Sequence, residues 1–354
     1  MTDHRPKAAP SPAERAAEPR FAEPNLAPTA VKRQHYVPRA HLRRFTDAND
    51  RLLCFDLDTS KSFGTAVENA AVGNRYYDLS FDDQTFSLES WLTEIETAAG
   101  PVIERLVRDP QGIAALSDSG EFALARFVAA QFFRVPAFRD WNEQVTRKIL
   151  TDLRDMAKQS LYNGVLGELS GAEADEIWAS WEQNPDHWWF GENEATPDVV
   201  VVADMLEETQ GWANLLRAKP WRIGNAADAS LLYTSDNPVA PFLTPVRPWW
   251  EPGGMATLAY WVPLSPDTLL VLGRMNRSVG ERSAKGPRNY RGFSRWEVSF
   301  SNHLQSHNAT RHIFGTGPYI PRDCAEGCLR SVTSAMRETA IRYLGFDPHP
   351  PRLG

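Results

Sequence analysis

One segment, residues 119–135, constrains the fold more than any other part of the chain. Its spacing predicts a single helix on which almost every position is apolar, so that no face is left for water. The polar exceptions are Arg126, Gln131 and Arg134. Such a helix is stable only when other elements surround it. We therefore expect a buried central helix, and an arginine on that helix has to meet an acid or an anion.

Further helices are predicted on both sides of the central one. Upstream, Ser87 is expected to cap a helix whose apolar residues recur at three- and four-residue steps from Leu88 to Leu106. Gly100-Pro101 predicts a kink or a break in it. The other predicted helices are 138–163, 172–183, 197–217 with Thr196 as its cap, 302–314 and 324–344.

Strand patterns occur at 52–57 and, after Pro220, at 231–234, 260–264, 268–272 and 296–300. Together these elements predict an α+β fold: a largely helical single domain with one modest mixed or antiparallel sheet. We place this domain at 31–345, with a helical middle at about 87–217. The Ala- and Pro-rich segment 1–30 is predicted to be a disordered tail, and 346–354 a short C-terminal tail.

The composition excludes several classes of protein. With 38 Lys and Arg against 45 Asp and Glu, the net charge is −7, so any contact with nucleic acid has to come from a local patch. No stretch approaches the roughly 20 apolar residues of a bilayer span. The three cysteines are too few for a disulfide framework. We expect a soluble, cytoplasmic protein without a membrane partner, whose oligomeric state stays open. No glycine-rich phosphate loop, nucleophile elbow or HExxH motif occurs.

A run of cations lies between Glu23 and Asp47, with no acidic residue inside it. The run contains Lys32, Arg33, His35, Arg39, His41, Arg43 and Arg44. If Pro38 opens a helix, Arg39 and Arg43 lie one turn apart on one face, which suits phosphate oxygens or paired carboxylates. His35 is a candidate general base or phosphate ligand. The alternatives are arginines that only solvate a short helix, and an imidazole bonded to a backbone carbonyl.

Two carboxylates border the apolar stripe of the predicted helix that follows Ser87. Glu89 and Glu96 are seven residues apart and stack on nearly the same side of it. At such a border each carboxylate needs a partner, which a divalent cation, Arg126, Arg134 or the cationic run would provide. The two carboxylates therefore have two possible interpretations, as a metal site or as part of a structural ion pair.

The sequence Thr234-Ser235-Asp236-Asn237-Pro238 predicts a rigid turn at the end of a strand. Asp236 is a candidate base or metal ligand, and Asn237 is displayed beside it. The alternative is a turn in which both side chains cap backbone amides. If the predicted helix 302–314 packs on the sheet, Asn302 and Arg311 face a common pocket with Asp236.

A zinc site is disfavoured, although four potential ligands are present. His303 and His307 have the same four-residue spacing as Cys324 and Cys328. The spacing is loose, and CxxxC is a weaker zinc signal than CxxC.

The ordered set of motifs resembles a bacterial family, the HYVP family called domain of unknown function 4238. The resemblance covers about 34–315 and rests on these segments: His35-Tyr36-Val37-Pro38 followed by Leu42 and Phe45, Leu88-Glu89 with Ile95-Glu96, 131–139, Ser235-Asp236-Asn237-Pro238, Pro263-Leu264-Ser265-Pro266, and 302–314. This sequence departs from the family's pattern in a tryptophan-rich insert at about 161–194. The resemblance implies one domain built from both ends of the chain. It also implies recurrent polar positions at His35, Glu89, Glu96, Arg134, Asp236 and Asn237, and less securely at Asn302 and Arg311.

An imidazole, several carboxylates and arginines are what a phosphodiester-cleaving site requires. The leading hypothesis is a hydrolase acting on a phosphate-bearing substrate, in its most specific form a nuclease. His35, Asp236 and Asn237 would be catalytic; Glu89, Glu96 and Asp236 would hold Mg²⁺ or Mn²⁺; Arg39, Arg43, Arg134, Asn302 and Arg311 would bind substrate. The alternative is a non-catalytic binding or toxin-type interaction protein whose polar network holds the fold.

Overall fold

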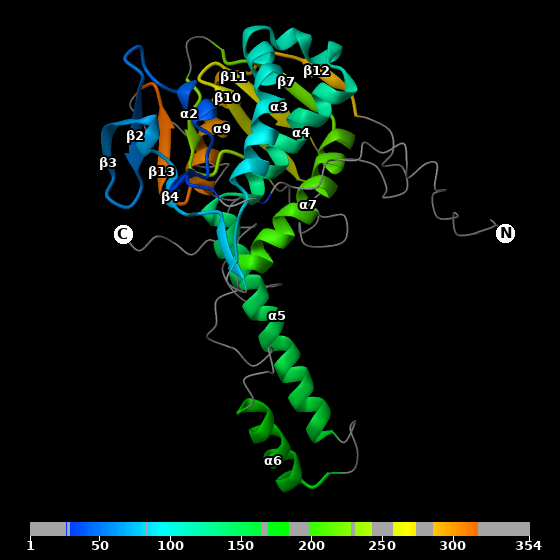
Figure 1. The fold of residues 1–354 in the computed structure, drawn as a ribbon. Helices are drawn as coiled ribbons and strands as arrows, with labels where there is room; N and C mark the ends of the chain where they lie inside the picture. Colours follow the sequence, from blue (N-terminus) through cyan, green and yellow to red (C-terminus); the bar gives the residue numbers. More distant parts are fainter. Residues whose placement is uncertain are drawn as a thin grey trace, which may run out of the picture.

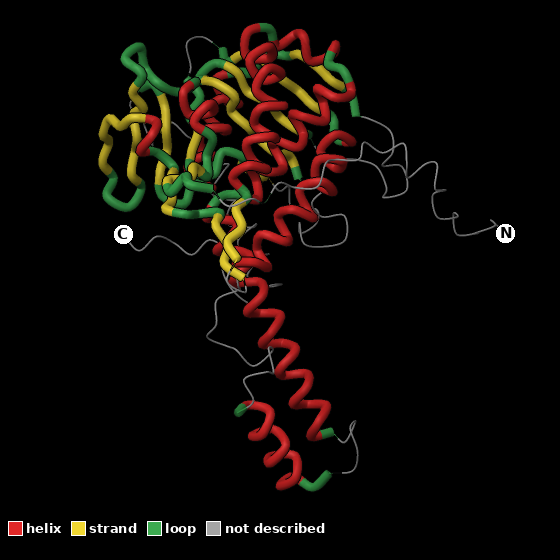
Figure 2. Tube along the Cα trace, in the orientation of Figure 1, coloured by secondary structure: helices red, strands yellow, loops and turns green. Residues whose placement is uncertain are grey.

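The structure is a computed structural model that describes residues 26, 29–81, 84–163, 169–183, 198–227, 231–242, 258–273 and 286–317. Within these ranges the fold is α+β, as predicted, with two main sheets and helices that cover them (Figures 1 and 2). The predicted tails lie outside the described residues except for 26, 29 and 30, and the predicted helix 324–344 lies outside them as well. None of the described helices combines the length and the apolar character that a membrane crossing requires.

The larger sheet has five strands in the order β12-β7-β11-β10-β9. Their bounds are Arg288–Tyr290, Trp221–Asn225, Thr268–Leu272, Ala259–Ser265 and Ala240–Phe242, in the same order. Neighbours are antiparallel except β12 and β7, which are parallel. Strands β10 and β11 are buried along their whole length, because helices cover both faces of this sheet.

Helices α3 (Glu89–Arg108), α4 (Asp118–Phe133) and α7 (Asp198–Ala218) cover one face of this sheet (Figure 1). Helix α4 contacts both α3 and α7, and its side chains join the largest core cluster. The prediction of a buried central helix is therefore confirmed. On the other face, α9 (Arg295–Asn308) packs against a second apolar cluster.

The smaller sheet joins segments from both ends of the described chain. Its antiparallel order is β3 (Lys61–Ala66), β2 (Arg51–Asp56), β13 (His312–Gly315) and β8 (Thr234–Ser235). Phe314 lies opposite Cys54 in the register, and both side chains are buried in a third core cluster.

Several short elements complete the described part of the fold. They are β1 (Arg33–His35) paired with β4 (Val72–Asn74), helix α2 (Arg39–Arg43), the 3-10 helices η1 (Val67–Asn69) and η2 (Pro110–Ala115), and the hairpin of β5 (Asp78–Phe81) and β6 (Gln84–Ser87). Helices α5 (Pro136–Tyr162) and α6 (Gly171–Glu182) pack on each other and project from the sheets as an arm (Figure 1).

The predictions for 296–314 were partly wrong, although 302–308 are helical as predicted. Residues 296–300 belong to α9, because Ser294 and Glu297 form a capping box that starts a helix there. The helix ends at Asn308 instead of reaching 314, and 312–315 form strand β13. The segment 296–300 has only three apolar residues, at alternating positions, so this error arose from the shortness of the pattern.

Three smaller expectations also changed. Leu88, not Ser87, is the N-cap residue of α3, although the Ser87 hydroxyl accepts from the Glu89 N–H at 3.4 Å. Helix α3 is continuous through Pro101, so the chain does not break at Gly100-Pro101. In place of one sheet there are two main ones, and the pattern at 231–234 yields only the short β8.

Candidate functional site

A cavity of about 530 Å³ opens where β1, α2, η1 and α3 meet. Charged and titratable side chains dominate its lining: Arg33, His35, Arg39, Arg43, Glu68, Glu89, Glu96 and Arg134. Six of these eight are residues that the sequence singled out as candidates, namely His35, Arg39, Arg43, Glu89, Glu96 and Arg134. We refer to it below as the arginine cavity.

His35 is held in the wall by its backbone. It pairs with Val72 across β1 and β4, and its carbonyl accepts from Arg134 Nη2 at 2.5 Å. Burial lowers the pKa of the imidazole, Arg39 lowers it further, and hydrogen bonding to the backbone of Val67 and Glu68 opposes both. Nε2 is buried and has no hydrogen-bond partner. His35 is therefore neutral at neutral pH, and one of its nitrogens is left for a ligand to satisfy.

Helix α2 presents two arginines to the arginine cavity. Pro38 is its N-cap, and Leu42 turns into the core, so Arg39 and Arg43 share the outer face, as predicted. Arg43 Nη2 lies 3.6 Å from a Glu68 carboxylate oxygen, with both side chains exposed. Among the described residues, Arg39 makes neither an ion pair nor a hydrogen bond, so its guanidinium is the cation available to an anion.

Arg134 fixes the floor of the arginine cavity. Its Nη1 donates to Glu96 Oε1 at 2.6 Å and its Nε to the Tyr77 hydroxyl at 2.9 Å. Burial opposes its charge, but Tyr77 and Glu96 outweigh burial and raise its pKa. The ion-pair reading of Glu96 is confirmed. Three nitrogens of Arg134 donate to protein acceptors and hold the floor together, while its predicted contact with substrate stays a prediction.

Glu89 begins α3 beside this floor. Burial raises the pKa of its carboxyl, Arg134 opposes that rise, and Glu96 adds to it. Oε2 is buried without a hydrogen-bond partner. Glu89 therefore keeps its proton to a higher pH than an exposed glutamate does.

The turn at Asp236 is a separate cluster, and its residues do not line the arginine cavity. Asp236 Oδ1 accepts from Thr310 N at 2.7 Å, and Oδ2 accepts from Arg311 N at 2.7 Å and His312 N at 2.8 Å. Burial raises the pKa of Asp236, and these three bonds oppose the rise. Both oxygens of Asp236 therefore accept hydrogen bonds from backbone amides, which is the turn-capping arrangement that was the alternative to a catalytic or metal-binding role.

The other predicted residues of that group also have structural partners. Asn237 Nδ2 donates to the Asn308 carbonyl at 3.1 Å, and Asn302 Nδ2 donates to the Leu231 carbonyl at 2.8 Å. Arg311 Nε donates to Asp56 Oδ2 at 2.9 Å. These contacts tie strands and turns together; the predicted catalytic role of Asn237 and the predicted substrate contacts of Asn302 and Arg311 stay predictions.

The predicted metal ligands do not assemble. Glu89 and Glu96 line the arginine cavity without Asp236, and the described residues contain no group of three or more His, Cys, Asp or Glu that could hold a metal ion. Of the disfavoured zinc set, His303 and His307 stack on α9 with ring centroids 6.3 Å apart, while Cys324 and Cys328 lie outside the described residues.

Sequence reasoning missed two kinds of residue at this site. Glu68 lies in the short 3-10 helix η1 and Tyr77 between β4 and β5; neither segment has a sequence pattern of its own, and only the fold places them here. His41 was grouped with the cations, yet it is buried on the inner face of α2, where Nε2 shares a hydrogen bond with Thr234 Oγ1 at 2.9 Å. Burial, followed by Arg44, lowers its pKa to about 3. The burial of His41 could have been predicted from its position next to Leu42 on the inner face of the helix.

Comparison with known proteins yields one match. Searches of the curated proteins and of the solved structures each returned no match. A family model does match residues 33–317, which include both the arginine cavity and the turn at Asp236. The chain therefore belongs to the family described as "Protein of unknown function (DUF4238)".

Proposed function

We propose that the protein is a hydrolase of a phosphate-bearing substrate, that the arginine cavity is its active site, and that the substrate is a nucleic acid. One observation carries the proposal. The unpaired guanidinium of Arg39 lines the same cavity as two orphaned polar atoms, His35 Nε2 and Glu89 Oε2. An anion-binding group beside a potential base and a potential acid is the minimum that phosphoryl hydrolysis needs.

Charge in the arginine cavity favours an anionic ligand. Glu96 is neutralised by Arg134, and Glu68 lies against Arg43. The lining holds four arginines against three glutamates, so positive charge is in excess even when Glu89 is ionised. A guanidinium with free N–H groups matches the tetrahedral oxygens of phosphate.

The rim favours a polymer over a small phosphate ester. Lys32, Arg33, Arg39 and Arg43 are all exposed along a stretch that contains no acidic residue. A row of cations of this kind can contact successive phosphates of one strand. The overall charge of −7 does not oppose this, because the contact is local.

The proposed reaction assigns one proton transfer to each titratable group. His35, being neutral, takes a proton from water while the water oxygen bonds to phosphorus. The bond from phosphorus to the leaving oxygen breaks, and Glu89 gives that oxygen its proton. Arg39 balances the charge that builds on the non-bridging oxygens. Arg134 is a positioning residue, since it holds the backbone of His35 and the carboxylate of Glu96.

The test is a cleavage assay on end-labelled RNA and DNA with Mg²⁺, with Mn²⁺ and with EDTA. We expect Arg39→Gln to reduce kcat/KM about ten- to a hundredfold, because it removes a charge-assisted contact to phosphate. His35→Gln should lower kcat by about 10²-fold or more, the range of general acid–base catalysis. The matched control is Arg108→Gln, an exposed arginine at the end of α3 that does not line the arginine cavity.

The second candidate is a protein that binds an anionic ligand without turning it over. The three hydrogen bonds of Arg134 favour it, because they show that part of the polar cluster stabilises the fold. In that case a labelled oligonucleotide binds, Arg39→Gln weakens binding, and no product forms under any of the three metal conditions. Wild-type protein that neither cleaves nor binds either nucleic acid would overturn the choice of nucleic acid as substrate.

A further inference from the structure

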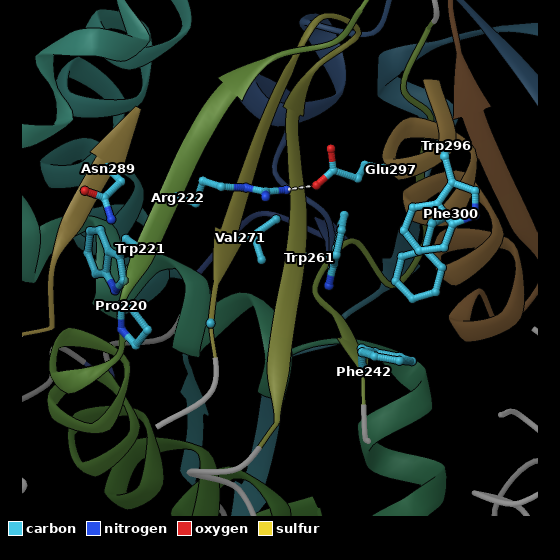
Figure 3. A pocket seen from close by; sticks show the side chains of 11 residues that line it. Pro220, Trp221, Arg222, Phe242, Trp261, Val271, Asn289, Trp296, Glu297 and Phe300 are labelled. Carbon is cyan, nitrogen blue, oxygen red and sulfur yellow. Dashed lines mark hydrogen bonds and ion pairs between the residues drawn. The ribbon is translucent and has the colours of Figure 1, made fainter. Parts of the chain in front are cut away.

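A second cavity, of about 480 Å³, lies on the α9 face of the five-stranded sheet (Figure 3). Arg222, Val271 and Trp261 form its floor as register neighbours on β7, β11 and β10. Phe300 and Trp296 of α9 and Phe242 of β9 form its wall. We refer to it as the aromatic cavity, and it shares no lining residue with the arginine cavity.

The wall of the aromatic cavity is preformed because its rings hold one another. Trp296 stacks on Phe300 with centroids 5.3 Å apart, while Trp261 and Phe242 contact Phe300 edge-on at 5.0 and 4.9 Å. Trp296 is nevertheless 55% exposed, which is unusual for an indole in a folded protein. A concave, largely apolar cavity of a few hundred Å³ with preformed aromatic walls is the usual form of a small-molecule site.

The charges of the aromatic cavity cancel. Arg222 Nη2 donates to Glu297 Oε1 at 2.6 Å, a bond that bridges the sheet to α9 (Figure 3). The second carboxylate oxygen of Glu297 accepts from the hydroxyl and the N–H of Ser294. A charged ligand would lose hydration here without gaining an unpaired counter-charge, so the cavity favours an uncharged one.

Two donor atoms of the lining are buried without a hydrogen-bond partner, Arg222 Nε and Trp261 Nε1. The Arg222 guanidinium already donates to Glu297 through Nη2, whereas Trp261, which is 8% exposed, has Nε1–H as its one side-chain donor. An orphaned donor of this kind destabilises the protein until an acceptor reaches it. A carbonyl oxygen on the ligand would supply that acceptor and fix the ligand's orientation against the apolar wall.

We propose that the aromatic cavity binds an uncharged, flat aromatic molecule whose carbonyl oxygen accepts a hydrogen bond from Trp261 Nε1. The bond selects among flat molecules, and Trp296 contributes contact area to all of them. This site is independent of the proposed hydrolase function, and its ligand need not contain phosphate.

The experiment is equilibrium dialysis of the full chain with two uncharged two-ring probes. The first probe, 7-methoxycoumarin, has a ring carbonyl; the second, 2-methoxynaphthalene, has the same ring count and no carbonyl. We expect Trp261→Phe, which removes the N–H and keeps an aromatic ring, to weaken coumarin binding about fivefold, as expected for one hydrogen bond. The affinity of the naphthalene should change by less than about twofold.

Two further variants complete the test. Trp296→Ala removes an exposed part of the wall, so it should lower the affinity for both probes by a similar factor. The urea midpoint of this variant should stay near that of the wild type. Trp178→Phe, on α6 in the arm, should change neither affinity. Failure of both probes to bind wild-type protein at about 1 mM would overturn the proposal, and so would wild-type affinities in Trp296→Ala. Equal weakening of both probes by Trp261→Phe would overturn the assignment of the N–H.

Discussion

Acid should weaken the attachment of α2, the helix that carries Arg39 and Arg43, because His41 on the inner face of the same helix is buried in the neutral form. Its side chain shares a hydrogen bond with Thr234 Oγ1, and its pKa is lowered from 6.5 to about 3. Between these two values the unfolded chain binds a proton that the folded chain does not. Stability is therefore lost as the pH falls below about 6.5, and the loss grows until about pH 3.

At moderate pH, the loss in free energy of unfolding depends only on the pKa that His41 has in the unfolded chain. At about pH 5 the unfolded imidazole is protonated and the folded one is not, so the free energy of unfolding falls by about 2 kcal/mol relative to about pH 7.5. This figure is insensitive to the folded-state pKa as long as that value stays well below 5. His41 is 2% exposed, so solvent screens the effect little.

The assay is urea unfolding at the two pH values, followed by tryptophan fluorescence. His41→Gln keeps a donor for Thr234 and has no proton to gain, so it should lose about 2 kcal/mol less on acidification than the wild type. Burial also lowers the pKa values of His35 and His303, but their contributions are common to both proteins and cancel in the comparison. His307→Gln, at an exposed position on α9, is the matched control. Equal acid losses in the wild type and His41→Gln would refute the reasoning.

Three further substitutions test the structure around the two sites. Arg134→Met should lower the free energy of unfolding by about 3 kcal/mol in urea, since it leaves Glu96 half-buried without its partner; a loss below about 1 kcal/mol would contradict that role. Asp236→Asn should cost about 1–3 kcal/mol by the same measurement and leave the affinity for a labelled oligonucleotide unchanged, whereas weakened binding at full stability would return Asp236 to the site. Gly224→Ala should lower the melting temperature, because its Cβ would lie 2.0 Å from the Arg291 carbonyl oxygen, and an unchanged melting temperature would show that β7 does not approach that loop.

Sequence patterns predicted the helices well because the information in them is local. The apolar faces of residues 119–135 specify α4 without reference to any other segment. The three apolar residues within 296–300 alternate as in a strand but are too few to exclude a helix, and the Ser294–Glu297 capping box was a local signal for α9. The two-sheet arrangement depends on pairing between β2 and β13, which are about 250 residues apart, and no local pattern encodes that pairing.

The candidate site was predictable to the extent that its residues are neighbours along the chain. Arg39 and Arg43 share a helix turn, and Glu89 and Glu96 share a face of α3, so sequence spacing alone grouped each pair correctly. Whether Asp236 joins them is a question of tertiary structure. The structure shows instead that it binds three backbone amides of the turn before β13. The polar residues singled out from the sequence therefore fall into two clusters, one around an open cavity and one that holds a turn.

Glu89 offers the most direct test of the claim that the arginine cavity is an active site. Glu89→Gln keeps the shape of the side chain, removes the titrating proton, and leaves the Arg134–Glu96 pair in place. The measurement is the initial rate of oligonucleotide cleavage by this variant, beside Asp236→Asn and the wild type, with urea midpoints for all three. The account predicts a fall of about 10²-fold or more for Glu89→Gln at a near-wild-type midpoint, and a rate within about threefold for folded Asp236→Asn. A Glu89→Gln rate equal to the wild-type rate, or a loss of cleavage confined to Asp236→Asn, would contradict it.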